Sequence, residues 1–157
     1  VTEKIQTLLT QNGINFDTFE HEPVRTSAEA SKVRTGYSIE QGAKALITRV
    51  KKDGEKKFVM IVVPGNKKFD KDKLKSEFGL SDVRFATENE ASEITSGVEF
   101  GGVPPLGNLF GLEVYVDRAL LENERIIFNA GDRSFSLGMR SEDYIKIVEP
   151  KLGDISC

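Results

Sequence analysis

The chain has 157 residues, of which 38% are hydrophobic and 30% are charged, so it can build one core beneath an ordinary polar surface. These values predict a single domain over residues 1–157 and exclude a largely disordered chain. No stretch reaches the roughly 18 to 20 consecutive apolar residues of a membrane span, and the first residues lack the apolar run of a secretory signal. We therefore expect a cytoplasmic protein with no membrane partner.

The net charge of −3 is unevenly distributed along the chain. Residues 49–75 hold ten Lys and Arg against four Asp and Glu, so this segment is basic and the remainder is acidic. A basic region can attract a polyanion through its phosphates, although the same pattern is typical of a solvated hairpin and helix face. If the segment binds such a polyanion, the lysines that we expect to contribute are Lys51, Lys52, Lys56, Lys57, Lys67 and Lys68.

The N-terminal part of the sequence contains clear local signals. Apolar residues at helical spacing predict a helix over residues 3–12, and alternation predicts a strand over residues 14–20. Capping boxes, in which Ser or Thr is followed three residues later by Glu or Gln, occur at Thr26 and Ser38. Each box predicts the start of a short helix.

Two strands and a helix are expected next. Residues 43–50 and 58–64 are strand-like, and Asp53-Gly54 between them favours a tight hairpin. Residues 58–64 form a nearly continuous apolar run, which is typical of a strand buried on both faces, so this strand should be central in its sheet. Residues 70–78 predict a charged surface helix that ends at Gly79.

The remaining third of the chain alternates irregular and regular segments. A third capping box at Thr87 predicts a helix to about Ile94. Residues 97–111 contain five Gly and two Pro, which excludes regular helix or strand there. Strands are then expected at 112–116, 125–129 and 134–139, with a turn at residues 130–132, followed by a helical turn from Ser141 and a final strand at 144–149.

This order of elements predicts an α+β fold with a mixed, curved, partly closed β-sheet flanked by short helices. The chemistry available to it is restricted, because the chain has one histidine and one cysteine, the latter at Cys157. A Cys/His pair, a cysteine-rich zinc site, an internal disulfide and a His-rich metal cluster are therefore excluded, and we expect no cofactor. An enzyme of this composition would act by positioning its substrate and stabilising charge, and backbone amides and a lysine side chain are the groups that could do so.

Four segments in order resemble the YbaK/prolyl-tRNA synthetase-associated domain family of editing deacylases, over nearly the whole chain. The segments are His21-Glu22-Pro23 with Thr26 to Ala30, Gly42 to Leu46, Gly101 to Gly107, and Asn129-Ala130-Gly131. The resemblance implies a pocket lined by Lys44 and by residues 101–105. It also implies hydrolysis without a protein general base, assisted by the vicinal hydroxyl of the terminal ribose and by water held on backbone groups.

The resemblance gives each candidate residue a role. Catalytic roles fall on Lys44, which would hold the phosphate or ribose of the terminal adenosine, and on Gly101 and Gly102. Two adjacent glycines allow a close backbone approach or a positive φ, and so could offer amides to the ester carbonyl. The expected substrate-binding residues are His21, Thr26, Ser27, Val103, Pro104, Pro105, Asn129, Ala130 and Gly131.

Simpler explanations exist for several of these residues. Lys44 could reach solvent from the start of its strand, His21 could be a loop residue, and Thr26 and Ser27 could serve only as helix caps.

The function that the resemblance implies is removal in trans of a small noncognate amino acid from mischarged tRNA. Some family members have a histidine where this chain has residues 127–131, and its absence argues against alanine-specific editing. The Ala130-Gly131 pair is closer to the branch that clears cysteine, so Cys- or Ala-tRNA(Pro) are the candidate substrates. The expected partners are aminoacyl-tRNA and an aminoacyl-tRNA synthetase, not DNA. The alternative is a non-catalytic module that binds a nucleotide or a tRNA end in the same pocket.

Overall fold

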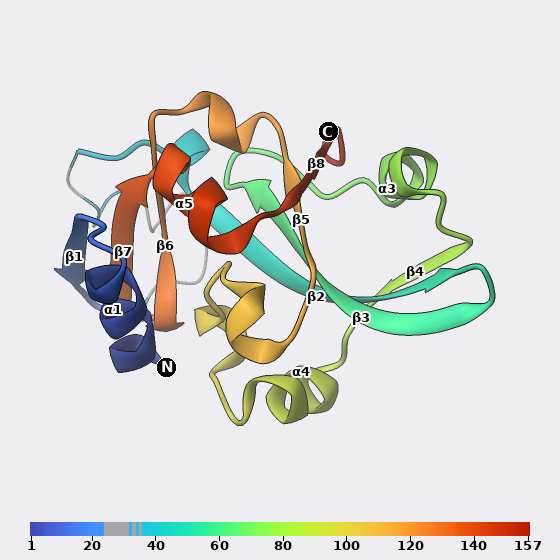
Figure 1. Ribbon diagram of the computed structural model, residues 1–157, viewed down its shortest axis with the longest axis horizontal. Helices are drawn as coiled ribbons and strands as arrows, with labels where there is room; N and C mark the ends of the chain where they lie inside the picture. The colour runs from blue at the N-terminus through green and yellow to red at the C-terminus, as the bar shows by residue number, and fades with distance from the viewer. Residues whose placement is uncertain (24–31, 33, 35) are drawn as a thin grey trace.

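The strands of the protein lie in two sheets in the computed structural model, which describes residues 1–23, 32, 34 and 36–157 (Figure 1). The smaller, antiparallel sheet has the order β1 (Phe16–Glu20), β7 (Phe135–Arg140) and β6 (Arg125–Asp132). The larger, mixed sheet has the order β4 (Asp82–Phe85), β2 (Ala43–Lys52), β3 (Glu55–Pro64), β5 (Val114–Asp117) and β8 (Lys151–Gly153).

The α+β class is confirmed, and the strands divide between two sheets instead of forming one. A parallel bridge between Gly42 and Ile127 joins the start of β2 to β6. Across the described part of the chain, neither sheet closes on itself. The bridge matters for function because it brings the start of β2 beside the smaller sheet.

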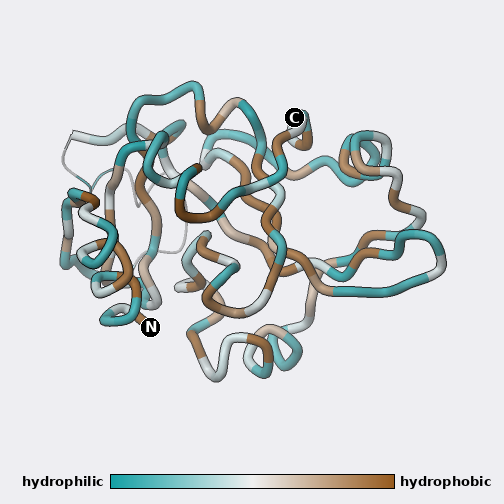
Figure 2. The backbone as a smooth tube through the Cα atoms, in the orientation of Figure 1, coloured by the Kyte–Doolittle hydropathy of each residue, from teal (hydrophilic) through white to brown (hydrophobic). Residues whose placement is uncertain are grey.

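Strand β3 is central in the larger sheet, as its apolar run predicts, and it is buried on both faces. Met60 and Val62 contribute to an inner core that also contains residues of the smaller sheet, α1 and α5. Val59, Ile61 and Val63 contribute to an outer core beneath α3. Figure 2 shows the corresponding hydrophobic colouring along the central strands and hydrophilic colouring at the β2–β3 hairpin tip.

Local signals fix most of the turns and helix ends. Asp53 and Gly54 both have positive φ, as a tight hairpin turn requires. The capping boxes at Ser38 and Thr87 are both formed, and Gly79 ends its helix in the left-handed conformation. The box at Thr26 lies outside the described residues.

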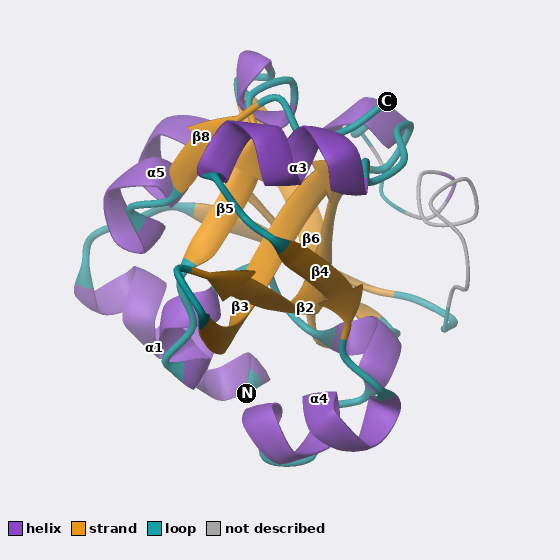
Figure 3. Ribbon diagram, turned by 90° about the vertical axis from the view of Figure 1, so that its right-hand side faces the viewer, coloured by secondary structure: helices purple, strands orange, loops and turns teal. Residues whose placement is uncertain are grey.

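Four α-helices are present in the described ranges, and Figure 3 shows how they lie around the strands. None of them is long and apolar enough to cross a membrane. The helices are α1 (Thr2–Gln11), α3 (Lys71–Phe78), α4 (Glu88–Thr95) and α5 (Ser141–Val148). Short 3-10 turns are η1 (Ile39–Gln41), η2 (Phe100–Gly102), η3 (Gly107–Phe110) and η4 (Leu120–Glu122).

Two sequence-based expectations near the C-terminus are wrong. Residues 144–149 belong mainly to helix α5 and not to a strand, because Ser141, Tyr144 and Val148 form one buried helical face. The turn expected at residues 130–132 lies instead at residues 133 and 134. Residues 130 and 131 occupy a register shift within β6, so the strand continues to Asp132.

Candidate active site

The loop from Gly101 to Pro105 is held tightly against the core. Gly101 is exposed, whereas residues 102–106 are buried. The Tyr144 hydroxyl, from helix α5, donates a hydrogen bond of 2.6 Å to the Pro105 carbonyl. Complete burial raises the pKa of Tyr144, so it stays a neutral donor. The loop therefore has a fixed position beside the end of β6.

The two adjacent glycines are explained by close approach to Asp132 and Arg133, at and just after the end of β6, and not by unusual backbone angles. Neither Gly101 nor Gly102 has a positive φ, so that part of the expectation is wrong. A Cβ on Gly102 would lie 2.9 Å from both the Cα and the N of Asp132, and one on Gly101 would lie 2.8 Å from Cδ of Arg133. At position 102 only glycine fits against the backbone of β6 without movement, whereas at position 101 an added methyl group would meet a side chain.

The peptide between Gly101 and Gly102 is hydrogen-bonded at both ends. The Asn129 side-chain amide donates to the Gly101 carbonyl at 2.9 Å. The Gly102 N–H donates to the Glu99 carbonyl at 2.8 Å. In this conformation the Gly102 amide is occupied within its own turn, which removes it as an oxyanion donor and leaves Gly101 as the candidate of the pair.

Arg34, which the sequence analysis does not single out, is the central charge of the site. Its Nε donates to Ser136 Oγ and its Nη2 donates to Asn129 Oδ1, each at 2.9 Å. Arg34 is only 7% exposed, and burial lowers its pKa to about 10, so it remains a cation at neutral pH. Among the residues that the structure describes, none supplies it with a carboxylate partner. No motif marks Arg34, since its role depends on contacts about 100 residues away.

His21 joins this cluster through Ser136. Its Nδ1 lies 2.8 Å from the Glu22 carbonyl, which can only accept, so we assign the proton to Nδ1. Its Nε2 lies 2.8 Å from Ser136 Oγ and therefore accepts from that hydroxyl in the neutral ring. His21 is thus placed beside Arg34, as a partner of Ser136.

Lys44 lies at the start of β2, on the same side of the strand as Arg34. Its Nζ donates to the Lys67 carbonyl at 3.1 Å. Burial, followed by the nearby charge of Lys68, lowers the pKa of Lys44. A Cβ on Gly42 would point to within 3.5 Å of Arg34 Nη1, and Lys44 follows two residues later on extended backbone, so both positions face the same way. Two cations therefore share this end of β2.

Several expected substrate-binding residues are placed in the core instead. Ala130 is fully buried in the inner core, and its carbonyl accepts a hydrogen bond of 2.6 Å from the Thr2 hydroxyl. Gly131, at φ 97°, packs against the N-terminus of α1. Val103 also belongs to the inner core. Because strand residues alternate, Asn129 faces Arg34 while Ala130 faces the core. Thr26 and Ser27 lie outside the described residues.

The basic segment does not form one patch. Lys51, Lys52, Lys56 and Lys57 lie at the tip of the β2–β3 hairpin, which extends away from the smaller sheet (Figure 1). Lys67 and Lys68 lie beside Lys44 at the other end of these strands. Eight residues of strand separate Lys44 from Lys52, or about 26 Å at 3.3 Å per residue.

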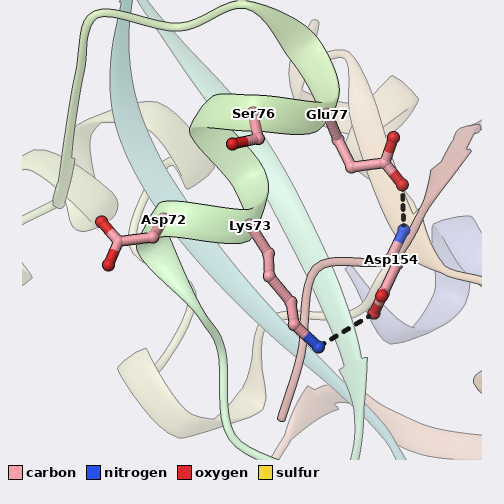
Figure 4. A pocket seen from close by; sticks show the side chains of 5 residues that line it. All are labelled: Asp72, Lys73, Ser76, Glu77 and Asp154. Atoms are coloured by element: carbon pink, nitrogen blue, oxygen red, sulfur yellow. Dashed lines mark hydrogen bonds and ion pairs between the residues drawn. The ribbon is translucent and has the colours of Figure 1, made fainter.

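A polar pocket of about 390 Å³ lies elsewhere, between α3 and the segment after β8 (Figure 4). Two contacts link its walls: Lys73 Nζ lies 3.4 Å from Asp154 Oδ1, and the Asp154 backbone N–H donates to Glu77 Oε1 at 2.7 Å. Figure 1 places α3 far from β6 and β7. These contacts attach the C-terminal segment to α3, and the pocket is separate from the candidate active site.

An α+β fold with a fixed glycine-proline loop, a buried arginine and a half-buried lysine could bind an anionic ligand by placement and charge. The chain belongs to the aminoacyl-tRNA editing domain family, whose sequence model matches residues 21–147.

The relatives agree with this assignment. The multifunctional Ser/Thr-tRNA deacylase ProXp-y of Escherichia coli K12 is 32% identical over 151 residues, which is 96% of this chain and 89% of that protein. EbsC of Enterococcus faecalis, named as a candidate Cys-tRNA(Pro)/Cys-tRNA(Cys) deacylase, is 24% identical over 95% of this chain and 90% of that protein. A crystal structure of a candidate trans-editing enzyme for prolyl tRNA synthetase has the same fold, with a TM-score of 0.83 and 23% identity over 99% of this chain and 96% of that one.

Proposed function

We propose that this protein is an aminoacyl-tRNA deacylase that acts in trans, hydrolysing the ester between a small noncognate amino acid and the terminal ribose of tRNA. The observation that carries the proposal is the fixed loop at residues 101–105 beside Arg34, in a chain that belongs to the editing-domain family. The E. coli deacylase matches over almost the full length of both chains, which supports action as a separate protein.

The site supports hydrolysis without a nucleophilic side chain. Lys44 and Arg34 provide positive charge for the anionic end of tRNA, and the fixed loop brings the Gly101 backbone amide close to the ester carbonyl. Ser136 is fully buried and already bonded to both Arg34 and His21, so it is a structural partner and not a nucleophile. Water then attacks the activated ester, assisted by the vicinal ribose hydroxyl.

The amino acid is selected by size within this proposal. An apolar pocket distinguishes one methylene by about 1 to 3 kcal/mol, so tRNA or a synthetase partner must supply further selectivity. The names of the two relatives give serine, threonine and cysteine as candidates, and the absence of histidine at residues 127–131 favours cysteine over alanine. We place this activity in the cytoplasm, with aminoacyl-tRNA as the partner and no role for DNA.

The first prediction is catalytic release of amino acid from at least one mischarged tRNA. The protein is incubated with tRNA(Pro) carrying Cys, Ala, Ser, Thr or Pro, and ester loss is followed against spontaneous hydrolysis. We expect turnover of a small noncognate amino acid and little release of proline, with no loss of activity in a metal chelator. Binding of the same tRNAs with no release above background would favour the non-catalytic module.

The second prediction concerns the two separate groups of lysines. The double variant Lys67→Gln/Lys68→Gln should weaken binding of both full tRNA and a short acceptor-stem minihelix, because these lysines lie beside Lys44. Its slope of log Kobs against log salt should fall by roughly 1 to 2, at about 0.7 to 0.9 per phosphate contact. Lys51→Gln/Lys52→Gln should weaken only full tRNA, since the hairpin tip is remote from the site. Salt slopes identical to wild type in both variants would identify these lysines as solvated surface.

A further inference from the structure

The orientation of the Asn129 amide is determined by its two partners. The guanidinium of Arg34 can only donate, so it must meet the Asn129 oxygen, and the Gly101 carbonyl can only accept, so it must meet the Asn129 nitrogen. The reversed orientation would place donor against donor and acceptor against acceptor. Asn129 therefore connects the buried cation to the catalytic loop in one direction only.

Arg34 is itself held in place from the other side. Its Nε bonds to Ser136, and Ser136 bonds to His21, whose backbone N–H donates a hydrogen bond of 2.9 Å to the carbonyl of Ser134, just before β7. The chain of contacts thus runs from His21 through Ser136, Arg34 and Asn129 to Gly101. Each member comes from a different segment of the fold, and the last bond ends on the loop.

The last contact in this series, from Asn129 to Gly101, fixes the plane of the Gly101–Gly102 peptide. Asn129 holds the Gly101 carbonyl, and the Glu99 carbonyl holds the Gly102 N–H on the opposite edge of the same planar group. The orientation of that plane sets the directions of the neighbouring loop amides. A small rotation would move those amides away from the position of the ester carbonyl.

We propose that Asn129, oriented by Arg34, is a positioning residue for deacylation that holds the Gly101–Gly102 peptide in the productive orientation and does not recognise the amino acid. This inference rests on the proposed function. It changes the role of Asn129 from substrate contact to support of the loop, and it gives the buried arginine a positioning role, through Asn129, that no sequence motif reveals.

Asn129→Asp is the most informative variant, because aspartate has the same shape but no donor. A carboxylate at this position would pair with Arg34 and repel the Gly101 carbonyl. It would therefore strengthen the contact with Arg34 and remove the hydrogen bond to Gly101. We expect the melting temperature to be unchanged or raised and kcat to fall about 10- to 100-fold, with KM changed less than threefold. A misplacement of about 1 Å can cost on the order of 10²-fold in rate. Arg34→Lys keeps the charge but cannot bond to Ser136 and Asn129 together, so it should lower kcat similarly.

Asn123→Asp is the matched control. Asn123 also donates through its side-chain nitrogen to backbone carbonyls, those of Glu40 and Leu120, but it lies away from the loop. We expect this variant to lose some thermal stability while keeping kcat. Amide hydrogen exchange across residues 97–107 should accelerate in Asn129→Asp and stay at the wild-type rate in Asn123→Asp, a result that does not depend on activity.

Three results for Asn129→Asp would overturn the inference: wild-type kcat and KM, a raised KM with wild-type kcat, or unchanged loop exchange. The second would show that Asn129 contacts substrate. Failure of the proposed function is distinguishable, because it would appear in the wild-type protein as no hydrolysis of any mischarged tRNA. The exchange measurement would still decide whether Asn129 holds the loop, and unchanged exchange would reject that role.

Discussion

Gly102→Ala is expected to reduce deacylation on the order of 10²-fold and to lower the stability of the protein by about 1 to 3 kcal/mol. The added methyl group would lie 2.9 Å from the Asp132 backbone, which cannot rotate away as a side chain could. Either the loop or the end of β6 must therefore move. Movement of the loop would displace the Gly101 amide from its proposed position beside the ester carbonyl, so turnover should fall even at temperatures where the variant is fully folded.

Gly101→Ala provides the matched comparison. Its methyl group would meet the Arg133 side chain, whose Nη1 lies 3.3 Å from Glu99 Oε1 and which can adjust. We expect a smaller loss of stability than in Gly102→Ala, together with a clear loss of kcat if the Gly101 amide approaches the ester. Thermal melting and kcat are measured on both variants. Wild-type turnover in both would remove the loop from the catalytic mechanism, whereas equal losses of stability and activity would indicate a purely structural role.

The parts of the fold that sequence predicts well are those determined by local interactions. The Asp53-Gly54 hairpin depends on two adjacent residues that accept positive φ, and the boxes at Ser38 and Thr87 depend on residues three positions apart. The burial of β3 is also visible locally, because its apolar run leaves no polar face. In each case the information lies within about ten residues.

The errors arise where tertiary contacts decide between local alternatives. Residues 144–149 fit both strand alternation and a helical face, and packing of Tyr144 beneath the loop selects the helix. Ala130 and Gly131 look like a turn, but contact with Thr2 of α1 holds them in an irregular part of β6. Arg34 has no local signature at all, because its partners at residues 129 and 136 are distant in sequence.

Lys44→Met should lower kcat/KM for deacylation about 10- to 100-fold while leaving the fold intact. Methionine keeps most of the apolar stem of the half-buried lysine and removes only the charge, so packing changes little. In the free protein the ammonium is bonded to the Lys67 carbonyl, and its pKa is lowered by burial and by Lys68. Removing that charge relieves repulsion from Lys68, so the melting temperature should be unchanged or slightly higher.

The size of the effect follows from the contact that Lys44 would make with substrate. A charge-assisted hydrogen bond contributes about 1.5 to 3 kcal/mol, which corresponds to roughly 10- to 150-fold in a rate or binding constant. If Lys44 holds the terminal phosphate or ribose, the loss should appear mainly as a higher KM, and Lys44→Arg should recover part of it by restoring the charge. Lys52→Met is the control, since it makes the same charge change at the remote hairpin tip and should keep kcat/KM for the minihelix at the wild-type value. A folded Lys44→Met protein with wild-type kcat and KM would exclude Lys44 from the active site and leave Arg34 as its cation.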